Sequence, residues 1–474
     1  MTAKIGDYTL RTLPWMLKLC FITSLASILL GSTVVHFTGR FIPVYYLFYA
    51  FVMIISIEGL FKFTKANLLY FPPAVMWLFV YLVVITGSTT YLYSNITNIF
   101  VYCKDNMTPF LLLLYCFSRI DCNYRICCFL KMIIYGGIFA GGYIVFEASS
   151  KMLNLFPAFN QAIYNYASMG GRSNVISYLD PDKISQFMTA TGVIRPRGLD
   201  ISFTASAFFL ASSLIIHLVC GRRLIKGHFI NILIVVLLYA SVLVSTSRQV
   251  ILSLHFILLI LFMLALKNKS LKGSLGHSLR RKLIAVGFAC LILAMVAGFL
   301  YTIPYQTLSF LLGRTGGASS VIARDLLALP SKLSICFCDF PLTAFCGIGA
   351  YTAAYPGIYH DLPEIGELHL LVGTFYNLGL IGSIIYWSIF FQAAFKCWRA
   401  FTRTSLRDSY QTTCLQDVYL TGFLLCLLYI GNLAHYSPTG LSTNFIIGLI
   451  LLISILADRN IKENSSAGTG KVLS

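Results

Sequence analysis

Charged residues are scarce in this sequence. Asp, Glu, Lys and Arg make up 11% of its 474 residues, whereas soluble globular proteins carry about 25%. Apolar runs recur along the whole chain and leave no stretch polar enough for an independent soluble domain of about 100 residues. Together with 58% hydrophobic residues and a mean hydropathy of +0.79, this deficit excludes a soluble protein and predicts an integral membrane protein.

Acidic residues are the scarcer of the two charged classes, with 17 Asp and Glu against 35 Lys and Arg. The net charge of +18 does not indicate nucleic-acid binding, because no basic stripe lies on a soluble face. The basic residues instead form short clusters between apolar runs, as expected where they set the topology of membrane spans.

The apolar runs predict an all-α polytopic membrane protein. A helix needs about 20 mostly apolar residues to cross the hydrocarbon core, because its backbone amides must be satisfied within the helix. The fourth run is interrupted by Lys104, Asp105 and Asn106, and the first is too long, and too closely followed by further runs, for a cleavable signal peptide. About twelve spans are predicted, at residues 14–35, 41–60, 73–91, 99–118, 128–148, 201–220, 229–246, 248–266, 283–303, 369–394, 418–435 and 441–457.

The basic clusters predict one orientation for all of these spans. Most Lys and Arg residues fall in the connections that face the cytoplasm if the N-terminus is inside, and both termini are then cytoplasmic. Two outer loops are long, and loops of such length are usually functional or disordered. The chain is therefore divided into a five-span bundle (1–148), a first long outer loop (149–200), a four-span segment (201–303), a second long outer loop (304–368), and a three-span segment with a cytoplasmic tail (369–474).

The sequence gives little support for a metal site or another cofactor, and none is predicted. Asp180 and Asp182 resemble an Asp-x-Asp metal motif, but the intervening proline favours a turn. Most of the 14 cysteines lie in spans or inner loops, where thiols stay reduced. Three lie in the second outer loop, where a disulfide without an assigned pairing is an open alternative: Cys336, Cys338 and Cys346.

Glycines cluster within the fifth predicted span. Small residues at such spacing allow close approach of neighbouring helices, and no strand or following lysine supports a phosphate loop. Helix packing is therefore predicted for Gly136, Gly137, Gly141 and Gly142. No internal repeat and no inverted pair of interrupted spans is evident.

The first candidate site precedes the sixth span, in the sequence Arg195-Pro196-Arg197-Gly198-Leu199-Asp200. Guanidinium groups on a stiff proline and a permissive glycine would bind a phosphate or diphosphate at headgroup level. The alternative is an interfacial anchor for phospholipid headgroups.

The second candidate is Arg248, which follows a very short connection, Ser245-Thr246-Ser247, between the seventh and eighth spans. An arginine at the membrane boundary is costly unless it faces a polar cavity or an anion. The alternative is a side chain that snorkels to the interface.

The third candidate is the second outer loop. It contains Arg314, a further candidate for diphosphate binding, and Arg324, and it ends with His369 at the start of the tenth span. An imidazole near its ordinary pKa suits a general base for a sugar hydroxyl. A helix cap or an interface residue is the alternative for this histidine.

These elements in this order resemble the O-antigen polymerase and O-antigen ligase superfamily, and specifically its Wzy-type polymerases. The resemblance covers about 195–390 and rests on Arg195 to Gly198, Ser247-Arg248, Arg324, Pro341, Gly347-Ile348-Gly349, His369, and Gly379-Leu380-Ile381-Gly382. The first five spans match only in hydropathy.

The resemblance implies a metal-independent glycosyltransferase of the bacterial inner membrane that acts on the periplasmic side. Undecaprenyl-diphosphate-linked glycans would be donor and acceptor, and a chain-length regulator would be a partner. Arg195 and Arg197 or Arg248 would neutralise the leaving diphosphate, Arg324 would assist, and His369 would orient or deprotonate the acceptor hydroxyl.

Two other functions stay open. An O-antigen ligase would transfer the glycan to lipid A core, but many ligases have Asn after this histidine, where the chain has Leu370. A flippase or exporter should carry ionisable groups along its spans, whereas here they are few and mostly near span ends.

Overall fold

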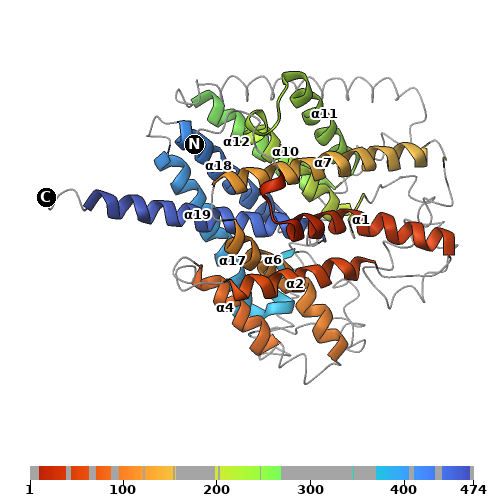
Figure 1. The fold of residues 1–474 in the computed structure, drawn as a ribbon, viewed down its shortest axis with the longest axis horizontal. Helices are drawn as coiled ribbons and strands as arrows, with labels where there is room; N and C mark the ends of the chain where they lie inside the picture. Colours follow the sequence, from red (N-terminus) through yellow and green to blue (C-terminus); the bar gives the residue numbers. More distant parts are fainter. Residues whose placement is uncertain are drawn as a thin grey trace.

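The computed structural model describes a helical protein. The described residues are 10–38, 44–62, 71–86, 96–120, 123–152, 155, 198–200, 203–245, 247–267, 345, 370–404, 410–432 and 440–469. Every regular element in these ranges is helical (Figure 1). This confirms the all-α prediction for the part of the chain that the structure describes.

The helices coincide with eleven of the predicted spans, and the predicted span 283–303 lies outside the described residues. A short turn, η1 (Leu10–Thr12), precedes the first helix, and a π-helical turn, η2 (Leu82–Thr86), continues the third. In chain order the helices are α1 (Trp15–Thr38), α2 (Tyr45–Phe61), α4 (Pro73–Tyr81), α6 (Ile96–Arg119), α7 (Asn123–Met152), α10 (Phe203–Leu224), α11 (His228–Val244), α12 (Arg248–Lys267), α17 (Leu370–Thr404), α18 (Tyr410–Gly431) and α19 (Thr443–Thr469).

Six of these helices are long and apolar enough to cross a membrane, so the chain has the character of a membrane protein. They are α1, α7, α10, α17, α18 and α19. Shorter apolar helices occur in α2, α4, α6, α11 and α12. The predicted total of about twelve spans therefore stays a prediction.

Several helices extend beyond the ends predicted from hydropathy. The polar residues Lys104, Asp105 and Asn106 interrupt the fourth apolar run but not the helix, because α6 continues through them. Helices α7 and α17 likewise continue beyond the predicted span ends at 148 and 394, to Met152 and Thr404. A helix keeps its hydrogen bonds in water as in lipid, so hydropathy detects its apolar part and not its end.

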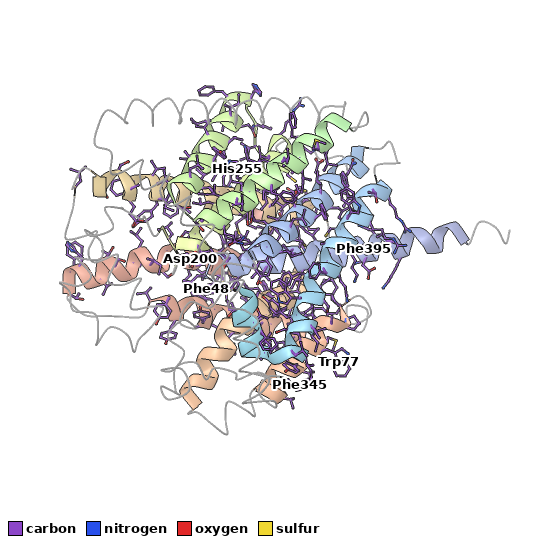
Figure 2. All side chains as sticks on the ribbon, turned by 180° about the vertical axis from the view of Figure 1, so that it is seen from behind. Phe48, Trp77, Asp200, His255, Phe345 and Phe395 are labelled. Atoms are coloured by element: carbon purple, nitrogen blue, oxygen red, sulfur yellow. The ribbon has the colours of Figure 1, made fainter. Side chains whose placement is uncertain are left out.

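Helix α10 lies at the centre of the described bundle. Its apolar window is entirely buried, and it packs against α7, α11, α12, α18 and α19. Outer helices instead expose large apolar side chains, as expected for contact with lipid; Trp77 of α4 and Phe395 of α17 are examples, whereas Phe48 of α2 is buried (Figure 2).

The predicted role of the α7 glycines is confirmed for three of them and wrong for the fourth. A Cβ on Gly137 would collide with Ser213 of α10, one on Gly136 would lie 2.5 Å from Phe21, and one on Gly141 would lie 2.9 Å from Ser241 Oγ. Among the described residues, nothing lies within 4 Å of that position on Gly142. The four glycines lie on more than one face of the helix, and Gly142 is on a face without a close neighbour.

Helix α17 is interrupted near its start, which hydropathy did not reveal. Gly379 has φ 65° and ψ −175°, a conformation that a residue without a Cβ adopts at little cost. The Tyr81 hydroxyl donates a 2.6 Å hydrogen bond to the carbonyl of Leu378. The break therefore divides α17 into a short first segment and a long second one, and its freed carbonyl has a partner.

Candidate functional site

Most of the predicted site residues lie outside the described part of the chain. The structure gives no account of the metal motif considered at Asp180 and Asp182, of the three loop cysteines (Cys336, Cys338 and Cys346), or of the site residues Arg195, Arg197, Arg314, Arg324 and His369. It describes Arg248 as the first residue of α12 and describes the three residues that follow Arg197. The site is therefore built from these two places.

The segment Gly198–Asp200 is held tightly before the start of α10. Gly198 has φ +73°, and a Cβ on it would lie 2.7 Å from Ser206 Oγ and 3.1 Å from Ile144 Cδ1. Its amide donates a 2.9 Å hydrogen bond to Glu147 Oε2 near the end of α7, in a buried environment. Glycine is thus required at this position, and the backbone directly after Arg197 is fixed against α7.

Asp200 attaches the same segment to the start of α19. The amides of Leu441 and Ser442 donate hydrogen bonds of 2.8 and 3.1 Å to its two carboxylate oxygens, and the Ser442 hydroxyl donates another. The carboxylate is buried, with 1% of the residue exposed. A carboxylate at a helix N-terminus satisfies unpaired amides and is stabilised by the helix dipole, so Asp200 caps a helix that lies 242 residues away in the sequence.

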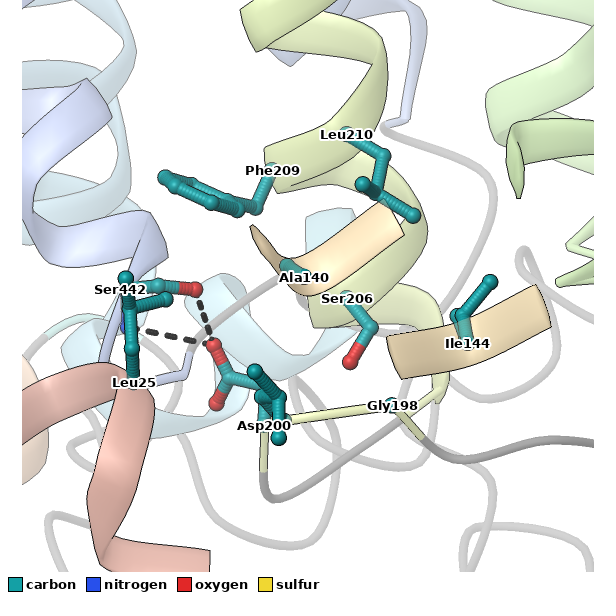
Figure 3. A pocket seen from close by; sticks show the side chains of 10 residues that line it. Leu25, Ala140, Ile144, Gly198, Asp200, Ser206, Phe209, Leu210 and Ser442 are labelled. Carbon is teal, nitrogen blue, oxygen red and sulfur yellow. Dashed lines mark hydrogen bonds between the residues drawn. The ribbon is translucent and has the colours of Figure 1, made fainter. Parts of the chain in front are cut away.

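A small cavity lies beside this attachment (Figure 3). Asp200 and Ser442 lie on one side of it, and Ser206 lies beside Gly198 (Figure 3). The opposite wall is apolar and comes from α1, α7 and α10: Leu25, Ala140, Ile144, Phe209 and Leu210. The cavity is a seam between helices next to the segment, and its apolar wall keeps the Asp200 hydrogen bonds away from competing water.

The start of α12 is attached to the end of α18. Gln249, the residue after Arg248, donates a 2.8 Å hydrogen bond from Nε2 to the carbonyl of Gly431. A Cβ on Gly431 would lie 2.6 Å from Ser253 Oγ, so the two helices approach closely at this point. The backbone at Arg248 therefore lies beside the last turn of α18.

The two attachments lie at the same end of the bundle. Helices α10 and α18 pack side by side in opposite directions: Phe208 contacts Tyr429 near one end, with 5.9 Å between ring centroids, and Arg223 pairs with Asp417 near the other. Helix α18 ends and helix α19 begins at the first end. Gln249 is bonded to Gly431 at the end of α18, and Asp200 is bonded to Leu441 and Ser442 at the start of α19. The start of α12 and the segment after Arg197 therefore lie at the same end of the bundle.

The opposite end of α10 holds a second buried charged group. Arg223 Nε lies 3.2 Å from Asp417 Oδ2, and their side chains are 16% and 3% exposed. Cys220 Sγ and Thr421 Oγ1, one turn further in, are 3.4 Å apart. This group joins two helices through oppositely charged side chains, as a structural contact does.

Groups suited to a metal ion are absent from the part of the chain that the structure describes, since no three His, Cys, Asp or Glu residues gather there. Eight cysteines whose side chains the structure describes form no disulfide, and seven of them are buried. Buried thiols of this kind behave as small apolar side chains.

The sequence analysis quoted Asp200 within the arginine-rich motif without a role and did not single out Glu147. One weak sequence signal points toward the Asp200 contact. The sequence Gly440-Leu441-Ser442-Thr443 before an apolar run indicates a helix start, but it does not show which acid caps it. The structure adds that a Cβ on Gly440 would meet the Asp200 carboxylate and lie 2.6 Å from Ala205 Cβ.

Comparison with known proteins adds no family to this picture. The chain matches no protein-family model, and no curated protein is significantly similar to it.

Proposed function

We propose that the chain is a metal-independent glycosyltransferase of the bacterial inner membrane, and specifically an O-antigen polymerase of the Wzy type. It transfers a growing glycan from undecaprenyl diphosphate to the non-reducing end of a new lipid-linked repeat unit on the periplasmic side. Its partners are the two lipid-linked oligosaccharides, membrane lipids and a chain-length regulator protein.

One observation supports this proposal most directly. The segment that follows Arg197 is bonded to the start of α19, and the residue after Arg248 is bonded to the end of α18. These two arginines come from separate parts of the sequence, and the described residues beside them lie at one end of the bundle. A diphosphate is already a good leaving group, so the protein must supply positive charge and positioning, effects of several kcal/mol each.

The roles follow from the chemistry of each side chain. Arg195, Arg197, Arg248 and Arg314 bind the diphosphate, for which guanidinium groups are suited without a metal ion. Arg324 stabilises the negative charge that develops as the diphosphate leaves. His369 orients or deprotonates the acceptor hydroxyl.

The test is an extension assay with purified full-length protein and a defined undecaprenyl-diphosphate tetrasaccharide, with and without a chelator. We expect chain growth that the chelator does not change, and no growth with Arg197→Ala or Arg248→Ala. Arg403→Ala, an exposed arginine in the last turn of α17, is the matched control and should grow chains normally. Normal products from either site variant would remove that arginine from the site.

The same assay separates the alternatives. A ligase does not lengthen the glycan unless lipid A core is added as acceptor, and a transporter does not lengthen it at all. The described carboxylates within spans also fit a transporter poorly. Glu147 and Asp417 are engaged with Gly198 and Arg223 near helix ends, whereas a translocation path needs ionisable groups along its length.

A further inference from the structure

We propose that Asp200 is a positioning residue for the site: its carboxylate fixes the segment after Arg197 relative to the start of α19, which packs against α18, and thereby relative to Arg248. The inference rests on the proposed function, since it assigns how the diphosphate-binding arginines are oriented.

The first step is the rigidity of the backbone next to Arg197. Gly198 is one residue away, so its Cα lies about 3.8 Å from that of Arg197. Gly198 is held by the Glu147 carboxylate and by close contact with Ser206, and Asp200 is held by three donors at the start of α19. Two anchors within three residues leave the backbone that leads to Arg197 little freedom.

The second step is the direction of the Asp200 charge. A carboxylate that faced a bound diphosphate would repel it. Both oxygens of Asp200 instead accept hydrogen bonds from Leu441 and Ser442, where a helix N-terminus carries partial positive charge. The negative charge of Asp200 is therefore compensated by these amide donors. The carboxylate can then lie close to the proposed diphosphate site without repelling the anion.

The third step is the link to the other arginine. The residues that Asp200 holds, Leu441 and Ser442, directly precede α19, and α19 packs against α18, which ends at Gly431. Gly431 accepts the hydrogen bond from Gln249, the neighbour of Arg248. Loss of the Asp200 contact would free the segment after Arg197, while Gln249 would still hold the start of α12. The separation of Arg197 and Arg248 would then no longer be fixed.

The test compares Asp200→Asn with the wild type in the extension assay, with rates expressed per folded molecule. The variant keeps the shape of the side chain but places an amide group, a donor, against backbone donors. We expect the rate of extension to fall at least tenfold, because small misplacements of binding groups strongly reduce catalysis. The matched control is Asp458→Asn in α19, the helix that Asp200 caps, where the acid pairs with Lys396 and Lys462 at 3.4 and 3.2 Å. Its rate should stay within twofold of the wild type.

A covalent replacement of the contact distinguishes positioning from chemistry. The side chains of residues 200 and 442 touch, so Asp200→Cys combined with Ser442→Cys can be joined with a mild oxidant and separated again with dithiothreitol. We expect the joined form to extend chains at no less than one third of the wild-type rate and the reduced form to lose at least tenfold. Asp200→Cys alone should lose at least tenfold under both conditions, whereas Ser442→Cys alone, which keeps the Asp200 carboxylate and both amide donors, should stay close to the wild-type rate.

Four results would overturn the inference. Wild-type extension by Asp200→Asn removes the role of Asp200, and loss of activity in Asp458→Asn shows a general effect of charge removal. An inactive joined form beside an active, equally oxidised wild type shows that the carboxylate itself is needed in the reaction. If the wild type extends no chain, the proposed function fails, and that result is distinct from the other three.

Discussion

The two ends of α10 hold their buried carboxylates in different ways. At one end Asp417 pairs with the guanidinium of Arg223, so that two side chains join α10 to α18. At the other end Asp200 and Glu147 accept hydrogen bonds mainly from main-chain amides, of Leu441, Ser442 and Gly198.

The difference lies in what each contact fixes. The Arg223–Asp417 pair ties two helices together through side chains alone and can absorb small shifts of either backbone. Hydrogen bonds to amides fix the backbone itself, and at the Asp200 end this includes Gly198, directly after Arg197 of the proposed site. One end of α10 therefore serves stability, and the other also determines geometry.

The largest expected effect comes from breaking the pair at the Arg223 end. Asp417→Ala leaves a mostly buried guanidinium without its partner, and we expect a loss of about 3–5 kcal/mol in the free energy of unfolding. Thermal and denaturant unfolding in detergent micelles measures this loss. Arg223→Met combined with Asp417→Leu should recover most of it, and an unchanged stability of Asp417→Ala would show that the pair contributes little.

The next effect comes from the other end. Glu147→Leu leaves the buried amide of Gly198 without its acceptor, and the lost bond to a charged group should cost about 1.5–3 kcal/mol. Glu147→Gln keeps an acceptor oxygen and should cost less. The comparison of the two ends predicts that Glu147→Leu also lowers the extension rate per folded molecule, whereas Asp417→Ala does not. Equal effects on this rate would show that the two ends of α10 do not differ in their influence on the site.

A substitution that packs against the middle of α10 should change the stability of the protein through packing alone. Gly137→Ala places a methyl group against Ser213 of α10, and overpacking of this kind costs about 1–3 kcal/mol. Gly142→Ala, on the open face of the same helix, should be neutral or stabilising by up to about 1 kcal/mol. Unfolding curves of the two variants, measured side by side, check this; a stable Gly137→Ala would indicate a looser contact between α7 and α10.

The smallest effect is expected far from both ends. Tyr81→Phe removes the hydrogen bond to the Leu378 carbonyl at the break in α17 and should cost about 0.5–1.5 kcal/mol. Thermal unfolding measures it. Neither end of α10 should respond, so a lower extension rate per folded molecule in this variant would show that the break contributes to the site.

The helices were predictable because burial in lipid depends on local composition. An apolar run of membrane length has few other stable conformations, so α10 and α19 could be located without knowledge of their neighbours. Their ends were less predictable. The polar turns of α17 up to Thr404 satisfy their own hydrogen bonds, and hydropathy does not distinguish them from loop.

The contacts at the candidate site were not predictable, because they join residues far apart in the sequence. The arginine-rich motif was visible as a motif, and the start of α12 at Arg248 follows from the short connection before it. That Asp200 caps α19 depends on how α10 and α19 pack, and no local pattern around Asp200 contains that information. The same reason explains Gly142, since spacing alone does not tell which face of α7 has a neighbour.

The complete burial of α10 has a consequence for how the protein is made. Its polar residues, including His217 and Arg223, leave the ribosome long before Asp417 and α19 exist. At about 5–20 residues per second the delay between Arg223 and its partner is about 10–40 s. During this interval the polar residues of α10 can be buried only against earlier helices or the insertion machinery. Helices α18 and α19 pack against α10 once they have been synthesised.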